Sequence, residues 1–193
     1  MSADDDDRMS ERATSITIRE ATPDDAAEIA RVHIESSRAT YVGLLPEETL
    51  SEMTYRKRLV NWSKTLEDHG GSEFVFVAEA EGQVVGFASG GPERTGDADG
   101  DGELYTVYLL PEQQRRGAGR RLVLAVAERL ARLGFRAMMV WVLADNPACR
   151  FYESLGGARV REEEIERGGR ALKKVAYGWA DIGALTERLR ASR

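Results

Sequence analysis

Hydrophobic positions along the chain change their spacing several times, and each spacing indicates one kind of element. Residues 26–33 and 55–66 carry apolar side chains three and four positions apart, as one face of an amphipathic helix does. Thr22-Pro23-Asp24-Asp25 precedes the first stripe, with proline and acids where a helix begins. Similar stripes run over 122–133 and 182–189. The pattern therefore predicts helices that each bury one face against a common core.

Shorter apolar runs, bounded by turn-forming residues, predict strands. They cover residues 15–20, 74–80, 84–90, 103–110, 137–143, 159–166 and 172–177. The turns Glu81-Gly82-Gln83 and Gly168-Gly169 join two pairs of them into hairpins. A short helix is expected between Asn146-Pro147 and Gly156-Gly157. The order β-α-α-β-β-β-α-β-α-β-β predicts an α/β domain in which helices cover both faces of a mixed sheet.

In the strand over 103–110, side chains should alternate between the two faces of the sheet. Period-two alternation predicts Glu103, Tyr105, Val107 and Leu109 on one face.

Composition indicates one ordinary domain. Of the 193 residues, 42% are hydrophobic, which is enough for a single sizeable core. Residues 1–14 contain four successive aspartates and little to bury, so they predict a disordered acidic tail. The domain is expected over 15–180. Residues 181–193 predict an amphipathic helix that packs on the body or on a second subunit of a homodimer.

Charge and cysteine content narrow the expected partners and location. The net charge of −6 argues against nucleic acid and anionic membranes as partners. No apolar run approaches the ~20 residues that cross a membrane, and the start of the chain is acidic, unlike a signal peptide. Cys149 is the single cysteine, so no intramolecular disulfide forms. We therefore expect a cytoplasmic protein.

A glycine-containing turn, Gln-Arg-Arg-Gly-Ala-Gly-Arg at 114–120, joins a predicted strand to a predicted helix. The first turn of a helix offers backbone N–H groups without intrahelical partners, and the helix dipole adds positive charge. Gly117 and Gly119 let the backbone approach an anion, and the arginines beside them add charge. The pattern favours a phosphate site, although a plain glycine turn before a basic, solvated helix start has the same composition.

Spacing separates this turn from two common nucleotide-binding turns. The Rossmann pattern needs a third glycine where Leu122 stands, and the Walker A pattern needs Lys-Ser/Thr where Arg120-Arg121 stand. The stretch from Leu104 to Gly119 instead resembles the acetyl-CoA signature, Gln/Arg-x-x-Gly-x-Gly/Ala, of the GNAT N-acetyltransferase superfamily. In that family the turn binds the pyrophosphate of coenzyme A.

A second stretch, Asn146 to Gly156, resembles the next motif of the same family, Asn-x-x-Ala-x-x-Phe-Tyr-x-x-x-Gly. The resemblance covers roughly residues 15–180, and it departs at Gly157, where the family usually has phenylalanine. It implies the GNAT fold, an α/β (α+β) domain with a mixed, mostly antiparallel sheet, helices on both faces and a splayed central strand pair. The residues that it implies for acetyl-CoA binding are Val107, Tyr108, Leu109, Gln114, Arg115, Arg116, Gly117, Ala118, Gly119, Arg120 and Asn146. Asn146 alternatively caps the helix that follows it.

The resemblance also implies a reaction, acetyl transfer from acetyl-CoA to a primary amine by direct attack. Glu103 stands where several family members carry a catalytic glutamate, which works as a base through a water. Its alternative is a solvated glutamate at the start of a strand. Tyr152 matches the family's usual general acid for the departing thiolate, and its alternative is an aromatic residue of the core.

Three other features have a structural explanation that competes with a chemical one. His33 is either a packed helix residue or a base, and the packed residue is favoured. Residues 97–102 copy the first half of an EF-hand calcium loop, but Tyr108 stands where the last ligand must be glutamate. Cys149 has no activating neighbour in sequence, which favours a buried inert thiol. We therefore expect no metal.

Two function classes remain open. The first is an acetyl-CoA-dependent N-acetyltransferase, and the second is an acyl-CoA sensor that keeps the fold without turnover. Because a sensor needs neither Glu103 nor Tyr152, the sequence favours the enzyme. The acceptor is a small-molecule or peptide amine. The apolar segment 41–46 either lines its pocket or merely connects two packed helices.

Overall fold

The computed structural model describes residues 15–68, 72–96 and 102–191. The elements are β1 (Thr17–Glu20), α1 (Ala26–Tyr41), α2 (Glu47–Ser51), α3 (Tyr55–Glu67), β2 (Phe74–Ala80), β3 (Gln83–Pro92), β4 (Gly102–Leu109), α4 (Ala118–Arg132), β5 (Met138–Leu143), α5 (Ala148–Ser154), β6 (Ala158–Arg167), β7 (Arg170–Trp179) and α6 (Ile182–Ala191). Every expected strand and helix within these residues is present, and α2 is an additional short helix. The tail predicted over 1–14 and the calcium-like run at 97–101 lie outside the described residues.

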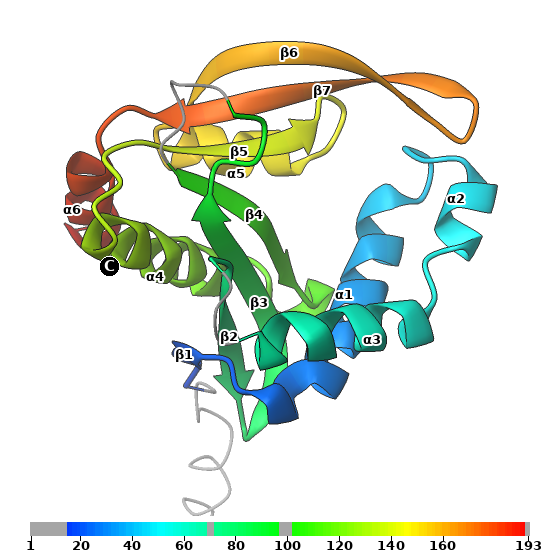
Figure 1. Cartoon of the computed structure of the whole chain (residues 1–193), viewed down its shortest axis with the longest axis horizontal. Helices are drawn as coiled ribbons and strands as arrows, with labels where there is room; N and C mark the ends of the chain where they lie inside the picture. Colours follow the sequence, from blue (N-terminus) through cyan, green and yellow to red (C-terminus); the bar gives the residue numbers. More distant parts are fainter. Residues whose placement is uncertain (1–14, 69–71, 97–101, 192–193) are drawn as a thin grey trace, which may run out of the picture.

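One sheet of seven strands runs through the described chain in the order β1-β2-β3-β4-β5-β7-β6 (Figure 1). All neighbouring strands are antiparallel except β4 and β5. Glycines with positive φ close both predicted hairpins, Gly82 between β2 and β3 and Gly168 and Gly169 between β6 and β7. A parallel pair cannot be joined by a tight turn, so α4 supplies the crossover from β4 to β5.

Helices cover both faces of the sheet. Tyr108 of β4 stacks on His33 of α1, with ring centroids 4.9 Å apart. The next residue, Leu109, faces α4, because a Cβ at Gly119 would lie 3.2 Å from its Cδ1. Neighbouring residues of a strand point to opposite faces, so α1 and α4 lie on opposite sides of the sheet, as Figure 1 also shows.

The strand β4 contains a bulge that its alternation did not predict. The register with β3 shifts by one residue at Tyr105. Glu103 and Tyr105 lie on the α1 face, whereas Val107 and Leu109 lie on the α4 face. The prediction that these four side chains share one face is therefore wrong, because one extra residue reverses the alternation along the strand.

The C-terminal helix α6 packs on the body of its own chain. Ile182, Leu185 and Leu189 are buried. The Arg120 guanidinium of α4 donates to the Leu189 carbonyl at 2.9 and 3.1 Å, and Arg190 pairs with Glu128 at 2.7 Å. Of the two alternatives for this segment, the structure therefore shows packing on the body.

No helix in the described part of the chain is long and apolar enough to cross a bilayer.

His33 is a buried member of an aromatic cluster between α1, α3 and the sheet. Its Nδ1 accepts a hydrogen bond of 3.1 Å from the Trp62 indole. Its ring centroid lies 5.6 Å from that of Phe87 and 4.9 Å from that of Tyr108. Burial, and then the charge of Arg58, lower the pKa of His33 from 6.5 to about 3. His33 is therefore a neutral packed residue near neutral pH.

His33 should make the stability of the protein depend on pH. Because the unfolded chain takes up a proton near pH 6.5 and the folded chain does not, stability is lost as pH falls below 6.5. This one residue should contribute up to ~1.4 kcal/mol per pH unit. His33→Gln retains an acceptor for Trp62 but cannot titrate, so urea unfolding between pH 7 and pH 4 should show a shallower loss. Parallel pH dependences for the two proteins would contradict this account.

Candidate active site

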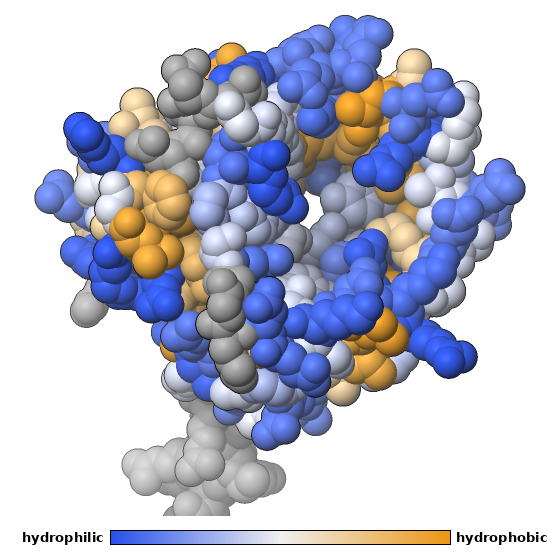
Figure 2. All heavy atoms as spheres, in the orientation of Figure 1, coloured by the Kyte–Doolittle hydropathy of each residue, from blue (hydrophilic) through white to orange (hydrophobic). Residues whose placement is uncertain are grey.

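β4 separates from β5 directly after Glu103. The two strands form two residue pairs, of which the second joins Glu103 to Met139, whereas β5 pairs with β7 along its whole length. The Leu110 N–H donates to β3, so the N–H and C=O groups of Val107 and Leu109 point toward the opposite, unpaired edge. The splayed central pair expected from the resemblance is confirmed. Figure 2 shows the surface hollowed in this region, between the β5–β7 layer and the helices α1 and α3.

The turn before α4 presents backbone N–H groups beside this separation. Arg115 and Gly117 have positive φ values of 62° and 83°, which turn the chain sharply into the helix. The Arg121 N–H donates to the Gly117 carbonyl, and the helix ladder starts there. Within the described residues, the N–H groups of 115–120 have no backbone acceptor. With the helix dipole behind them, these groups form a site for an anion.

Side chains of the turn divide into two groups. Arg115 is exposed, and the exposed Arg116 contacts Gln113 at 3.2 Å. Gln114 instead donates to the Leu109 carbonyl at 3.2 Å, and Arg120 is turned toward α6. Gln114 and Arg120 therefore hold the turn in place with their side chains. The Gln114 N–H donates to the Pro111 carbonyl at 3.2 Å, so of these two residues only Arg120 has, within the described chain, a backbone N–H without a backbone acceptor.

The helix α5 begins with a side-chain cap and carries the predicted acid. Asn146 is buried, and its Oδ1 accepts the Ala148 N–H at 2.9 Å, which is the capping alternative proposed for it. Cys149 lies against the carbonyls of Leu143 and Ala144, with Sγ–O distances of 3.5 and 3.6 Å. Burial raises the pKa of the Cys149 thiol, as expected for an unreactive cysteine.

Tyr152 lies on α5 among aromatic rings, with its centroid 5.4 Å from Phe151 and 5.9 Å from Tyr177. Among the described residues no hydrogen-bond partner is found for its hydroxyl. Burial, and then the neighbouring Tyr108, raise the pKa of Tyr152 above its ordinary value of 10.0. Tyr152 is therefore a protonated hydroxyl close to the splayed half of β4.

Glu103 lies on the α1 face where the strands separate, and it forms an ion pair that sequence reasoning missed. Its carboxylate is 2% exposed and accepts from Arg94 Nη2 at 2.6 Å, Nε at 3.1 Å and the backbone N–H at 3.2 Å. The Arg94 guanidinium also lies 3.8 Å from the centre of the Tyr105 ring. Arg94 is in the loop after β3, and no sequence spacing links it to its partner.

Tyr41, at the end of α1, is a second residue that sequence reasoning did not assign to the site. Its hydroxyl accepts a hydrogen bond of 3.3 Å from the Tyr108 hydroxyl. The apolar character of segment 41–46 pointed to this region, but the contact depends on how α1 packs against β4.

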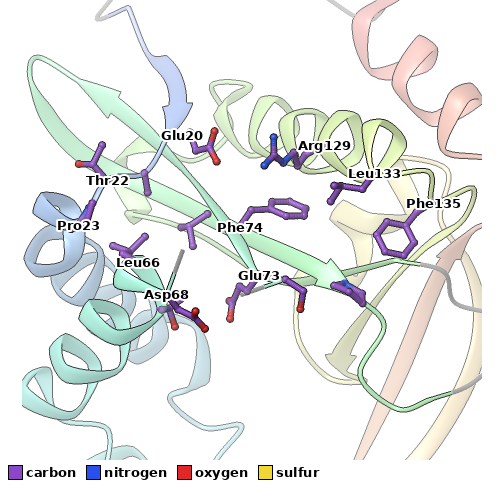
Figure 3. Close-up of a pocket in the computed structure, with 15 residues that line it drawn as sticks. Glu20, Thr22, Pro23, Leu66, Asp68, Glu73, Phe74, Arg129, Leu133 and Phe135 are labelled. Atoms are coloured by element: carbon purple, nitrogen blue, oxygen red, sulfur yellow. The ribbon is translucent and has the colours of Figure 1, made fainter. Parts of the chain in front are cut away.

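A cavity of about 570 Å³ lies elsewhere, where β1, α3, β2 and the end of α4 meet (Figure 3). Figure 3 shows Phe74 at its centre, with Glu20 and Arg129 to one side and Asp68 and Glu73 to the other. None of the predicted site residues lines this cavity. The candidate site is therefore the open separation of β4 from β5, with the turn before α4 beside it.

Comparison with known proteins agrees with this geometry. The sequence profile of the acetyltransferase (GNAT) family matches residues 34–157. The chain is 44% identical over 172 residues to the uncharacterized N-acetyltransferase YuaI of Bacillus subtilis (strain 168), covering 88% of this chain and 96% of that protein. It is 27% identical over 184 residues to a phosphinothricin N-acetyltransferase of Streptomyces viridochromogenes, covering 91% of this chain and 88% of that protein. The structure of YncA from Salmonella typhimurium with its cofactor acetyl-CoA has a TM-score of 0.65 and 25% identity, covering 87% of this chain and 95% of that chain.

Proposed function

This chain belongs to the acetyltransferase (GNAT) family, and from that premise we propose that it transfers an acetyl group from acetyl-CoA to a primary amine by direct attack. The observation that carries the proposal is the edge of β4 left open beside the unpaired N–H groups of the turn before α4. An open strand edge suits the amide-containing arm of coenzyme A, and a helix N-terminus suits its pyrophosphate.

The donor would lie across the separated strands. The backbone N–H groups of 115–120, with Arg115 and Arg116, would hold the pyrophosphate. Val107 would offer its N–H and C=O groups, and Leu109 its N–H group, to the pantetheine arm and the acetyl carbonyl, while the Leu109 carbonyl accepts from Gln114. Tyr108 belongs to the same stretch. Fixed donors at a carbonyl oxygen matter most when negative charge develops there in the transition state.

Tyr152 would act as the general acid. Its raised pKa keeps it protonated, and its hydroxyl has no partner in the described part of the chain. It can therefore hydrogen-bond the departing sulfur and supply a proton as the thiolate forms. A thiolate whose conjugate acid has a pKa near 8.5 leaves fairly well unaided, so this contribution should be moderate.

The amine would approach from the α1 side of the sheet. At pH 7 an alkylamine of pKa near 10.4 is about one part in a thousand neutral, which corresponds to roughly 4.6 kcal/mol against attack. Glu103 lies on the correct face to take a proton, but Arg94 occupies both of its oxygens. These contacts favour a positioning role for Glu103. The amine would then enter in its neutral form, and the proton that it loses on forming the amide would pass to water or backbone carbonyls.

An acyl-CoA sensor remains the competing function. The test is to incubate the purified chain with acetyl-CoA and a panel of amines and to follow the free thiol. Release of thiol that depends on the amine supports the transferase, and tight acetyl-CoA binding without release supports the sensor.

A cytoplasmic location and the oligomeric state stay predictions.

Gly119→Glu is expected to weaken acetyl-CoA binding by about 100-fold or more, because it brings negative charge to the proposed pyrophosphate site. Gly119→Gln is the matched control. It adds the same bulk against Leu109, so the two variants should have similar melting temperatures while the glutamine variant binds more tightly. Calorimetric titration with acetyl-CoA measures this difference. Unchanged affinity in a folded Gly119→Glu variant would refute the pyrophosphate site.

Tyr152→Phe keeps the ring contacts with Phe151 and Tyr177 and removes only the hydroxyl. Turnover should fall about 10 to 1000-fold, while acetyl-CoA affinity and melting temperature stay close to those of the parent. Steady-state kinetics at saturating acetyl-CoA gives the first value, and calorimetry and thermal unfolding give the others. Unaltered turnover would mean that Tyr152 is only a packing residue.

Glu103→Gln should lower the free energy of unfolding by about 2 kcal/mol, because Arg94 loses a charged partner that is buried. Glu112→Gln, at an exposed position, is the control and should change stability by less than ~0.5 kcal/mol. For a positioning residue, the pH profiles of turnover for the parent and Glu103→Gln should run parallel. If the activity of Glu103→Gln instead climbs about tenfold per pH unit while the parent levels off, Glu103 is the base.

A further inference from the structure

The cavity of Figure 3 lies at the end of the sheet where β1, β2 and the end of α4 meet, apart from the separation of β4 from β5. Its floor is apolar. Phe74 lies at the centre, Leu66 of α3 lies to one side, and Leu133, directly after α4, lies to the other. The volume of about 570 Å³ falls within the ~300–1,000 Å³ of small-molecule sites. The cavity can therefore hold a ligand at least as large as an amino acid.

Arg129 of α4 is the one cation among the described residues that line this cavity. Its guanidinium lies 6.0 Å from the centre of the Phe74 ring. The Nε atom is buried and has no hydrogen-bond partner, and in the described part of the chain the guanidinium makes no other hydrogen bond and no ion pair. A half-buried cation that has lost water without gaining an acceptor is unfavourable. An anionic group on a ligand would stabilise it.

Glu20 presents a carboxylate on the same face of the sheet as Arg129. In the register of β1 and β2, Glu20 lies opposite Phe76, so the two side chains point to one face. Phe76 and Phe74 are two positions apart on β2 and share that face, with ring centroids 6.1 Å apart. Because Arg129 lies over Phe74, Figure 3 shows Glu20 and Arg129 on one side of the cavity. The described structure contains no ion pair between them, so both charges remain for the two charged groups of one ligand.

Two further carboxylates lie on the other side of the cavity. Glu73 directly precedes β2, and Asp68 directly follows α3. Figure 3 shows both across Phe74 from Glu20 and Arg129. Three carboxylates and one guanidinium thus surround an apolar floor. A plain amine would leave the guanidinium without an acceptor, and a plain carboxylic acid would meet an excess of negative charge. The lining therefore matches a ligand with one carboxylate and two cationic groups.

We propose that this cavity binds a basic α-amino acid, such as lysine, at a site separate from the acetyl-transfer site. The ligand carboxylate accepts hydrogen bonds from Arg129, and the α-ammonium group pairs with Glu20. The aliphatic part of the ligand side chain covers Phe74, and its terminal cation pairs with Glu73. None of the residues assigned to acetyl transfer lines the cavity, so this site is independent of the proposed function.

Leucine methyl groups can report where such a ligand binds. Leu66 and Leu133 line the cavity, whereas Leu143 lies on β5. The full chain, with its leucine methyl groups labelled for NMR, is titrated with L-lysine without acetyl-CoA, so that no transfer occurs. The Leu66 and Leu133 resonances should shift and give the Kd, and the Leu143 resonances should stay in place.

Three analogues of lysine each lack one charged group. Cadaverine lacks the carboxylate, 6-aminohexanoate lacks the α-amino group, and L-norleucine lacks the side-chain amino group. Since all three groups have a partner in the proposed site, each analogue should bind at least about 10-fold more weakly than lysine. Cadaverine that binds as tightly as lysine would overturn the role of Arg129. Norleucine or 6-aminohexanoate that binds as tightly would overturn the basic amino acid as ligand.

Arg129→Gln removes the proposed partner of the carboxylate. It should weaken lysine binding about 10 to 100-fold and change cadaverine binding less than about threefold. Arg132→Gln is the matched control, because Arg132 is an exposed arginine of the same helix outside the cavity, and it should change neither. Glu73→Gln should weaken lysine binding about 10-fold without affecting norleucine, and it serves if Arg129→Gln does not fold.

Unshifted Leu66 and Leu133 resonances, or equal losses of lysine and cadaverine binding in Arg129→Gln, would overturn the site. Shifts at Leu143 alone would overturn it as well, because lysine would then bind near the separated strands. Acetyl-CoA binding and amine-dependent thiol release by Arg129→Gln should match those of the parent, so failure of the cavity site leaves the proposed transferase intact.

Discussion

The separation of β4 from β5 is the constraint on which the rest of this molecule depends. Two parallel strands that pair over two residues leave backbone groups at the centre of a sheet without a partner strand. Such groups are unfavourable unless water or a ligand satisfies them. The strands are nevertheless held firmly on their other sides, because β4 pairs with β3 and β5 pairs fully with β7. The opening is therefore a rigid feature of the sheet.

Side chains pack against β4 on both faces of the sheet beside this opening. On one face, α1 and α3 place the rings of His33 and Trp62 against Tyr108 and Phe87. On the other face, Leu109 packs closely on the start of α4, where a Cβ at Gly119 would lie 3.2 Å from Leu109 Cδ1. Because of the bulge at Tyr105, Glu103 and Tyr105 lie on the α1 face, whereas Val107 and Leu109 lie on the α4 face. This packing holds the open edge of β4 next to the helix N-terminus.

Several polar side chains in this region hold loops, turns and helix ends in place. Glu103 holds Arg94 and through it the loop after β3, Gln114 holds the turn to the Leu109 carbonyl, and Asn146 caps α5. Each is buried or occupied within the protein. Tyr152 differs from them, since its hydroxyl has no hydrogen-bond partner among the described residues. The division suggests which groups build the site and which are left to meet substrates.

The sequence by itself determined the elements and the donor site. Apolar spacing predicted every strand and the main helices, and the turn at 114–120 with the Asn146–Gly156 motif identified the family, because these features depend on residues close together in the chain. Only the tertiary structure decided the bulge at Tyr105, the Arg94–Glu103 pair and the Tyr41–Tyr108 contact. A bulge is set by packing on both faces of a strand, and the two contacts join residues 9 and 67 positions apart. Local spacing carries no information about such contacts, because they form only when the helices and loops are packed around the sheet.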